Sequence, residues 1–132
     1  MKLSPDIARD ILLFLEKYLT IDTNFKYNTV TVDYLTRYSS FTDADSSDIA
    51  YTILKLSEAG FIKTKMPSDN NPRFMSISSI TYQGHEFLDS IRNEEHYSKA
   101  KDICSKLGSF SLDILKTTAK SVIVSAINNN IN

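Results

Sequence analysis

Hydroxyl and cationic side chains recur in two neighbouring stretches of the chain, in a pattern typical of contact with nucleic acid. Lys63, Lys65 and Arg73 flank a run of turn-forming residues, and their charges could bind backbone phosphates. Polar side chains of the preceding helix could reach base edges, and a lysine of that helix could reach a phosphate. The candidate DNA-binding residues are Ser46, Ser47, Tyr51, Lys55, Lys63, Lys65 and Arg73.

Acidic residues oppose this interpretation at one end of the expected helix. Asp43, Asp45 and Asp48 lie at or near its N-terminus, which is the end that a helix-turn-helix protein brings to DNA. The same acids favour the helix, because they cap it and complement its dipole. Residues 1–60 hold six Lys and Arg against nine Asp and Glu, whereas residues 61–93 hold four against three. Any positive surface is therefore expected around residues 61–93.

Other chemistries find little support in the residue pattern. Asp43-x-Asp45 begins like an EF-hand loop, but Asp48 and Leu54 stand where that loop needs Gly and Glu. His85 and His96 lack a cluster of further ligands, so surface or packing roles are expected for them. Cys104 falls on an apolar stripe and is expected to be a small buried hydrophobe. We expect no catalytic residue, no metal ligand and no cofactor, and hence no enzyme.

Aromatic side chains offer an alternative, as stacking platforms for single strands. The residues concerned are Tyr34, Tyr38, Tyr51, Tyr82 and Phe87. Packing in the core or at its rim is the favoured interpretation, above all for Phe87, because large aromatic side chains dominate small cores.

The composition sets the class of protein. The chain has 132 residues with 42 % apolar and 23 % charged residues, which indicates one ordinary globular domain with an appended helix. A net charge of -1 excludes a strongly basic, histone-like protein. One cysteine excludes an intrachain disulfide. No run of apolar residues is long enough for a signal peptide or a membrane span, so we expect a cytoplasmic protein and no membrane partner.

The first half of the chain predicts three helices and a hairpin. Ser4-Pro5 opens a helix to about residue 19, residues 29–32 are β-branched and extended, and a short helix follows at 33–38, capped by Asp33 or Thr31. Thr42 to Asp45 resembles a capping box that starts a third helix, which ends at Gly60. Arms at 61–66 and 73–80 flank the turn residues 67–72.

Residues 81–132 predict further helices, at 81–93, at 94–107 up to Gly108, and from Ser109 or Ser111 onward. The last helix carries one apolar face together with apolar residues away from it. The face consists of Leu112, Leu115, Ala119, Val122, Ile123 and Ala126. This surplus predicts that the helix either folds back over the preceding domain or pairs with a second chain. The asparagines from Asn128 onward predict a frayed end.

The order of elements predicts an α+β, mostly α fold. A helix that runs through Gly60 directly into a two-stranded hairpin is typical of a winged helix-turn-helix, with the hairpin as the wing. We expect a winged-helix domain at 1–93 and a C-terminal helical extension at 94–132, for packing or dimerisation.

Two stretches carry a family resemblance. Residues 49–62 (IAYTILKLSEAGFI) look like the third helix of many bacterial winged-helix proteins. Residues 80–92 (ITYQGHEFLDSIR), followed by Tyr97, Lys99, Lys101, a glycine break and residues 111–116, resemble an uncharacterised family frequent in phages and prophages and related to the YjcQ-like proteins. The resemblance covers about residues 4–125 and implies a winged-helix fold and a phage context, without an activity. Many relatives have His where Thr52 stands here.

Two functions follow as hypotheses. The first is a small regulator encoded by a phage or prophage, which binds double-stranded DNA. We expect it to form a homodimer through its C-terminal helix. The alternative is a protein–protein interaction module for host takeover or counter-defence, which binds a host protein with the acidic end of the third helix and the apolar C-terminal helix.

Overall fold

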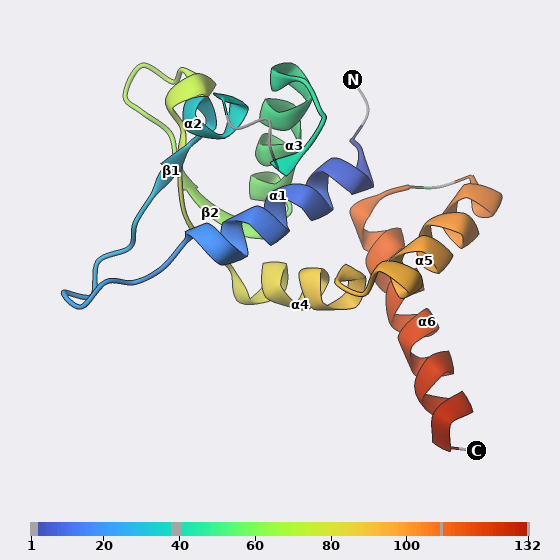
Figure 1. Cartoon of the computed structure of the whole chain (residues 1–132). Coiled ribbons are helices and arrows are strands. Elements are labelled where there is room, and N and C mark those ends of the chain that lie inside the picture. The colour runs from blue at the N-terminus through green and yellow to red at the C-terminus, as the bar shows by residue number, and fades with distance from the viewer. Residues whose placement is uncertain (1–2, 38–40, 109, 132) are drawn as a thin grey trace. The chain divides into compact units, whose positions relative to one another are not determined.

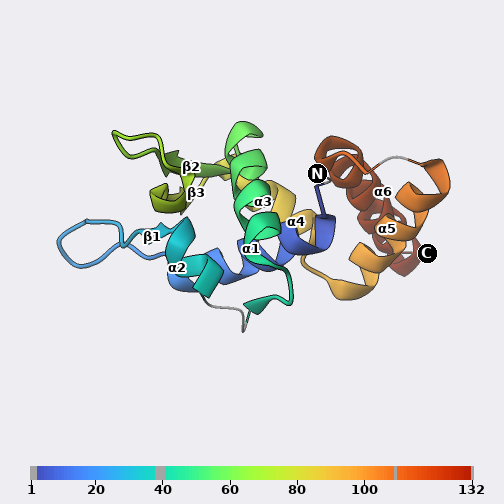
Figure 2. The ribbon, with the colours of Figure 1, turned by 90° about the horizontal axis from the view of Figure 1, so that it is seen from above.

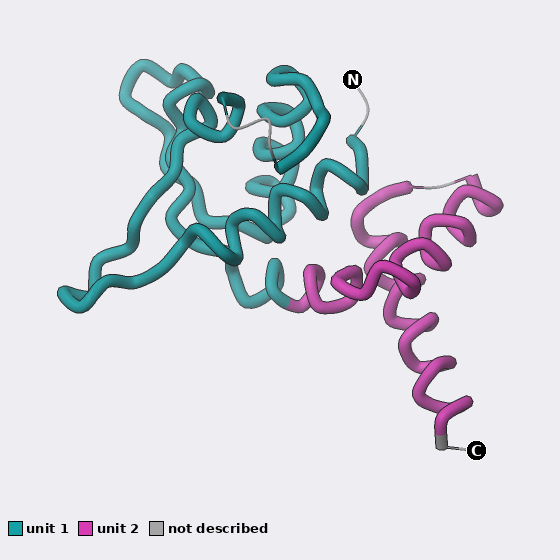
Figure 3. Tube along the Cα trace, viewed as in Figure 1, with its two compact units in different colours: residues 1–85 teal, residues 86–132 magenta. Residues whose placement is uncertain are grey.

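A computed structural model describes residues 3–37, 41–108 and 110–131. Six α-helices and a three-stranded antiparallel sheet make up this part of the chain, so the expected α+β, mostly helical class is confirmed. The chain forms two compact units, Met1–His85 and Glu86–Asn132, which meet within one helix (Figure 3). The boundary expected near residue 93 stays a prediction.

Unit 1 holds a bundle of short helices and the sheet (Figure 1). Its elements are α1 Pro5–Tyr18, β1 Val30–Thr31, α2 Val32–Arg37, α3 Ser46–Glu58, β2 Ile62–Lys65, the 3-10 helix η2 Pro72–Phe74, β3 Ser76–Ile80 and the start of α4 Tyr82–Ile91. The strand order is β1-β3-β2. The expected two-stranded hairpin is present as β2 and β3. The sheet has a third strand because β1, which was expected only as an extended stretch, pairs with β3 through Val30↔Ile77 and Thr31↔Ser76. Val30 and Ile77 are both buried, which favours this pairing.

The core of unit 1 lies where α1, α2 and α3 meet the sheet. Its largest fully buried side chains there are Ile11, Leu12, Leu15, Leu35, Ile49, Ile53, Leu56 and Ile77. On α1 and α3 these residues recur at helical spacing, so each helix turns one apolar stripe inward. Full burial of one such side chain stabilises the fold by about 2 kcal/mol. The helix register that this burial imposes decides which residues of α3 face solvent.

Caps set where the helices begin. Ser4 caps α1, and its Oγ accepts a hydrogen bond from the amide of Ile7 at 3.4 Å, as predicted. Thr31 caps α2 by accepting from the amide of Tyr34 at 3.1 Å. The capping box predicted from Thr42 is wrong: α3 begins at Ser46, and Asp45 is its N-cap.

Thr42 has a different role, in the segment that precedes α3. Its buried hydroxyl accepts from the amide of Ala44 at 3.3 Å and also hydrogen-bonds the carboxylate of Asp10 on α1. Burial raises the pKa of Asp10 above its ordinary value, and the hydrogen bond from Thr42 works against that rise. Thr42 therefore links the segment that precedes α3 to helix α1.

The hairpin departs from the prediction in its return arm. β3 begins at Ser76, and Arg73 lies in η2, where Pro72 occupies the first helical position and Asn71 caps it. The Oδ1 atom of Asn71 accepts from the amide of Arg73 at 3.1 Å. A proline and an asparagine in succession favour such a turn over a strand. β2 pairs with β3 from Ile62↔Ile80 to Lys65↔Ser76, with a register shift between Lys63 and Thr64.

Unit 2 contains the rest of α4 and two further helices, α5 Glu94–Leu107 and α6 Leu112–Ile131, which pack against one another. Gly108 ends α5 in the left-handed conformation, at φ 72°, as predicted. Ala100 and Cys104 of α5 and Leu115 and Ala119 of α6 are buried.

α6 continues further than the asparagine-rich end predicts. The helix runs to Ile131, so fraying from Asn128 onward is wrong for these residues. A helix that is already nucleated extends with one hydrogen bond for each added residue, which offsets the weak propensity of asparagine. Within the described ranges, no helix is both long and apolar enough to cross a membrane.

Unit 1 contains a close approach between the start of α4 and the residues that link α3 to β2. A Cβ atom added to Gly84 would lie 1.9 Å from the carbonyl oxygen of Phe61. Thr81 strengthens the junction: its amide donates to the same Phe61 oxygen at 3.0 Å, and its hydroxyl donates to the carbonyl of Gly60. Gly84 in turn donates its amide to the Thr81 hydroxyl at 3.1 Å. Only glycine fits here, because the obstructing atom belongs to the backbone.

We expect Gly84→Ala to lower the free energy of unfolding by about 2 kcal/mol, since the new methyl group must displace the Phe61 carbonyl. Helix propensity alone predicts the opposite sign, a gain of about 1 kcal/mol. Urea unfolding of the full chain measures the difference. Gln83→Ala, at an exposed position in the same turn, is the matched control and should change stability by less than about 0.5 kcal/mol. Unchanged or increased stability in Gly84→Ala would refute the steric argument.

Candidate nucleic-acid interface

The outward face of α3 presents hydroxyl groups at its N-terminal end. Ser46 and Ser47 are exposed, while Tyr51 and Lys55, further along the helix, are half-buried. The opposite face holds Ile49, Ile53 and Leu56 in the core, so the helix cannot rotate to hide the polar face. The sequence therefore predicts correctly that these four candidates share the side of α3 away from the core.

Thr52 belongs to the buried side of α3. It is 1 % exposed, and its hydroxyl donates to the carbonyl of Asp48 at 2.6 Å. The position at which many similar proteins are expected to carry His thus faces the core in this chain.

Lys55 is engaged within its own helix. Its ammonium lies 2.9 Å from a carboxylate oxygen of Glu58 and 5.4 Å from the centre of the Tyr51 ring. The hydrogen bond to Glu58 raises the pKa of Lys55. An exposed pair of this kind contributes little to stability, so a phosphate can replace Glu58 at small cost.

The lysines of the hairpin are placed differently. Lys63 and Lys65 are both exposed on β2 and lie two residues apart, as expected for side chains that share one face of a strand. Within the described part of the chain neither lysine makes an ion pair. These two charges are therefore the most available of the predicted cations.

Arg73 joins a cluster that sequence reasoning missed. Its Nε lies 2.7 Å from Oδ1 of Asp33 on α2, and the second oxygen of Asp33 lies 3.3 Å from Nη2 of Arg37. Asp33 and Arg73 are 40 residues apart, so no local pattern could pair them. Only Arg37 could have been found from sequence, because it follows Asp33 at helical spacing and can pair with it. The hydrogen bond from Arg73 lowers the pKa of Asp33, with a smaller contribution from the charge of Arg37.

A hollow of about 570 Å³ connects this cluster to the start of α3. It is lined by Val32, Asp33, Thr36, Arg37, Ser46, Ser47, Ala50, Pro72 and Arg73. The structure thus brings three of the predicted contact residues, Ser46, Ser47 and Arg73, to one site, and it leaves Lys63 and Lys65 along the hairpin.

Two of the three aspartates near α3, Asp45 and Asp48, serve the helix, as the favoured interpretation requires. The Oδ1 atom of Asp45 accepts from the amide of Asp48 at 2.9 Å, and Asp48 lies in the first turn. Asp43 is exposed before the helix. Capping does not remove these charges, so the N-terminal end of α3 remains acidic.

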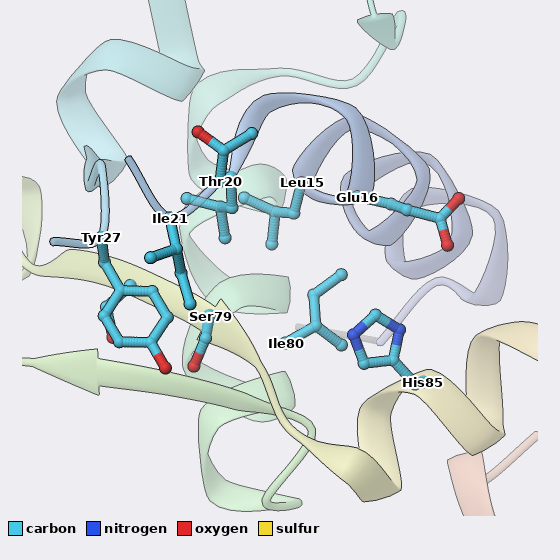
Figure 4. Close-up of a pocket in the computed structure, with 10 residues that line it drawn as sticks. Leu15, Glu16, Thr20, Ile21, Tyr27, Ser79, Ile80 and His85 are labelled. Atoms are coloured by element: carbon cyan, nitrogen blue, oxygen red, sulfur yellow. The ribbon is translucent and has the colours of Figure 1, made fainter. Parts of the chain in front are cut away.

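A second cavity, of about 300 Å³, lies beneath α1 (Figure 4). Its lining includes Leu15 and Glu16 of α1, Ile80 of β3 and His85, which points from α4 toward α1 (Figure 4). Within the residues that the structure describes, His, Cys, Asp and Glu form no group of three that could hold a metal ion. The cavity presents one imidazole and a mixed polar and apolar wall.

The remaining sequence predictions concern buried and aromatic residues. Cys104 is a free, buried thiol and Phe87 is fully buried, so both packing predictions are confirmed. Tyr34 packs beside Tyr18 with a ring separation of 5.6 Å, whereas Tyr82 is 76 % exposed. Tyr38 lies outside the described residues.

α6 is buried over part of its length only. Leu112, Leu115 and Ala119 lie in the core of unit 2, whereas Val124 and Ile127 are about half exposed. A groove of about 520 Å³ runs between α5 and α6, with Ile103 and Val122 among its apolar lining. Pairing of α6 with a second chain stays a prediction.

These features define a small α+β protein with a polar helix face, a lysine-bearing hairpin and an arginine cluster in one compact unit. Residues 2–111 match a family model described as "Hypothetical protein (DUF2513)", and the chain belongs to that family. The match ends just before α6. The chain is also similar to an "Uncharacterized protein" of Haemophilus influenzae strain Rd, with 33 % identity over 124 residues that cover 93 % of this chain and 96 % of the relative. No solved structure matches the chain.

The Asp33 cluster makes a prediction for titration. Because the pKa of folded Asp33 lies below its ordinary value of 3.8, its ion pairs stabilise the fold above that pH range, and the stabilisation is lost as pH falls through the lowered pKa. We expect Arg73→Gln to raise the Asp33 pKa more than Arg37→Gln does, since the Arg73 hydrogen bond is the larger cause. Carboxyl NMR titration of Asp33 measures all three proteins, and an unshifted pKa in Arg73→Gln would contradict the pairing.

Proposed function

We propose that this chain is a winged-helix protein that binds double-stranded DNA and acts as a regulator encoded by a phage or prophage. The observation that carries the proposal is the order of unit 1: α3 runs through Gly60 directly into β2, and the β2–β3 hairpin is completed by β1 in one sheet (Figure 1). This is the arrangement in which a winged helix presents a recognition helix beside its wing.

The side chains divide into two kinds of contact in this proposal. Ser46, Ser47 and Tyr51 approach base edges in the major groove, because hydroxyl groups both donate to and accept from bases. Lys63 and Lys65 of the wing bind phosphates, and Lys55 does so after it leaves Glu58. Phosphate contacts position the protein, and the helix reads the sequence.

The charge balance predicts how this binding depends on salt. The chain carries a net charge of -1, so attraction to DNA comes from a few local cations rather than from the whole molecule. At physiological salt, charges more than about 8 Å apart are largely screened, so acids elsewhere in unit 1 oppose binding weakly. Asp43 and Asp48 lie close to the proposed contact and reduce affinity directly.

We expect Lys63→Gln/Lys65→Gln to weaken duplex binding and to lower the slope of log affinity against log salt by about 2, since each lost phosphate contact lowers it by about 0.9. Fluorescence anisotropy with labelled duplex at several salt concentrations measures this slope. The charge-matched control is Lys99→Gln/Lys106→Gln on α5, both exposed, which should leave the slope unchanged. Absence of duplex binding by the unaltered protein at low salt would overturn the proposed function.

A loop of unit 1 favours the alternative, a protein–protein interaction module. Residues 20–28 project from the body of unit 1 in both views (Figures 1 and 2). Phe25 lies in this loop, 89 % exposed, and its backbone is in the left-handed region at φ 62°. Ile21 and Tyr27 flank it as an antiparallel bridge and are each more than half exposed.

Hydrogen bonds make this loop rigid. The Oδ1 atom of Asp22 accepts from the amides of Asn24 at 2.8 Å and Lys26 at 3.0 Å, and the Asp22 carbonyl accepts from Phe25. At the base, the Asn28 side chain accepts from the amide of Thr20 and donates to the carbonyl of Tyr18 at 2.7 Å. An aromatic side chain held on a rigid loop suits insertion into an apolar pocket of a partner protein. This surface differs from the acidic α3 end and the C-terminal helix expected from sequence.

We expect Phe25→Gly to abolish capture of a host protein while the fold stays at least as stable, because glycine relieves the left-handed backbone strain. Affinity purification from host cells, paired with thermal unfolding, measures both effects. Tyr82→Ala removes another exposed aromatic ring and should leave capture intact. Capture that survives Phe25→Gly would exclude this loop as the contact.

A further inference from the structure

The Asp33 cluster is organised in a way that its ion pairs alone do not explain. Each oxygen of the carboxylate contacts a different arginine, Oδ1 at 2.7 Å from Arg73 and Oδ2 at 3.3 Å from Arg37. The Asp33 side chain is only 20 % exposed, whereas the arginine side chains are 59 % and 69 % exposed. The acid therefore lies at the back of the cluster, and the two guanidinium groups reach solvent.

The two guanidinium groups retain donors for a further acceptor. A guanidinium has five N–H donors, and the contacts with Asp33 use one nitrogen of each arginine. Arg73 is also held over the ring of Phe74, with 5.6 Å between its Cζ and the ring centre. With one carboxylate against two guanidinium groups, the cluster has a net charge of +1.

The hollow beside the cluster adds neutral donors. Exposed Ser46 and Ser47, at the start of α3, line the same 570 Å³ space as both arginines. A phosphate group has oxygen acceptors for several donors at once, and guanidinium forks match its geometry. A volume of this size accommodates a phosphodiester with its flanking sugars.

We propose that Arg37 and Arg73, oriented by Asp33 and joined by the hydroxyl groups of Ser46 and Ser47, form a clamp for one phosphodiester of duplex DNA. This inference rests on the proposed function and names an anchoring site within it. Arg37 and Arg73 carry the charge, and Asp33 is a positioning residue that touches the DNA only through them. The clamp sits beside the N-terminal end of α3. In this finer assignment Ser46 and Ser47 bind the phosphate instead of base edges, and the clamp sets the register in which Tyr51 meets the bases.

A clamp of net charge +1 makes a distinctive prediction for salt dependence. Loss of either arginine leaves a net charge of zero, so Arg37→Gln and Arg73→Gln should each lower the slope of log affinity against log salt by about 0.9. The double variant should lower it little further, because both arginines serve one phosphate. Arg92→Gln, which removes an ion-paired arginine directly after α4, is the matched control and should leave the slope unchanged.

The role of Asp33 is tested by a change that adds positive charge. If the arginines acted as charges alone, Asp33→Asn would tighten DNA binding. We expect it to weaken binding, because both guanidinium groups lose their orientation. Asp43→Asn removes one negative charge from the exposed segment before α3 and should tighten binding. Thermal unfolding of each variant shows that the fold persists, and tighter binding by Asp33→Asn overturns the positioning role.

The outcomes separate this inference from the proposed function. If the unaltered protein binds duplex DNA and both arginine variants behave like Arg92→Gln, the clamp is wrong and DNA binding stands. If the unaltered protein does not bind duplex DNA, both fail. NMR titration with inorganic phosphate distinguishes the source of the ligand. Shifts at the amides of Ser46 and Ser47 without DNA binding would assign a free-anion site and overturn the assignment to the DNA backbone.

Discussion

The carbonyl of Phe61 approaches residue 84 so closely that only glycine, which has no side chain, fits there, and this close approach holds unit 1 in register. At this one place α3 ends, β2 begins, β3 ends and α4 begins. Gly60 turns the chain at φ 78°, the amide of Phe61 returns to the carbonyl of Leu56 at 3.0 Å, and Thr81 bonds the carbonyls of Gly60 and Phe61. With both elements anchored here, the polar face of α3 and the lysines of β2 keep a defined separation. Any ligand that spans both depends on this junction.

The electrostatics of the proposed interface follow from which acids have internal partners. Asp33 shares its carboxylate between Arg37 and Arg73, and Asp45 gives one oxygen to the α3 backbone. Each acid therefore organises a group that faces DNA in the proposal, although each also reduces the local positive charge. Lys55 and Glu58 form a surface pair that contributes little stability, so phosphate can displace the acid. A chain of net charge -1 can bind DNA in this way only with steep salt dependence.

Local signals in the sequence predicted most helix positions, and long-range contacts account for the failures. The Ser4, Thr31 and Gly108 caps and the buried Cys104 were predictable, because spacing and propensity act within a few residues. The start of α3 was missed since Thr42 and Asp45 are both competent caps, and burial of Thr42 against α1 decides between them. The pairing of β1 with β3 and of Asp33 with Arg73 joins residues that are 40 or more positions apart, beyond any local pattern. The polar face of α3 and the lysines of the hairpin were thus predictable from sequence, and the arginine cluster was not.

Phe25 distinguishes the two proposed functions on energetic grounds. A left-handed backbone costs a residue with a side chain about 1 kcal/mol, and an 89 % exposed ring regains almost nothing by burial. Glycine or asparagine would close the same Asp22 turn at less cost, so the stability of the free protein does not explain phenylalanine at this position. The arginine cluster presents the reverse case, because its ion pairs already exist in the free protein and DNA would only add to them. The exposed ring gains free energy only when another molecule buries it. Under the alternative function, the loop is therefore a better candidate than the arginine cluster for the contact with a protein partner.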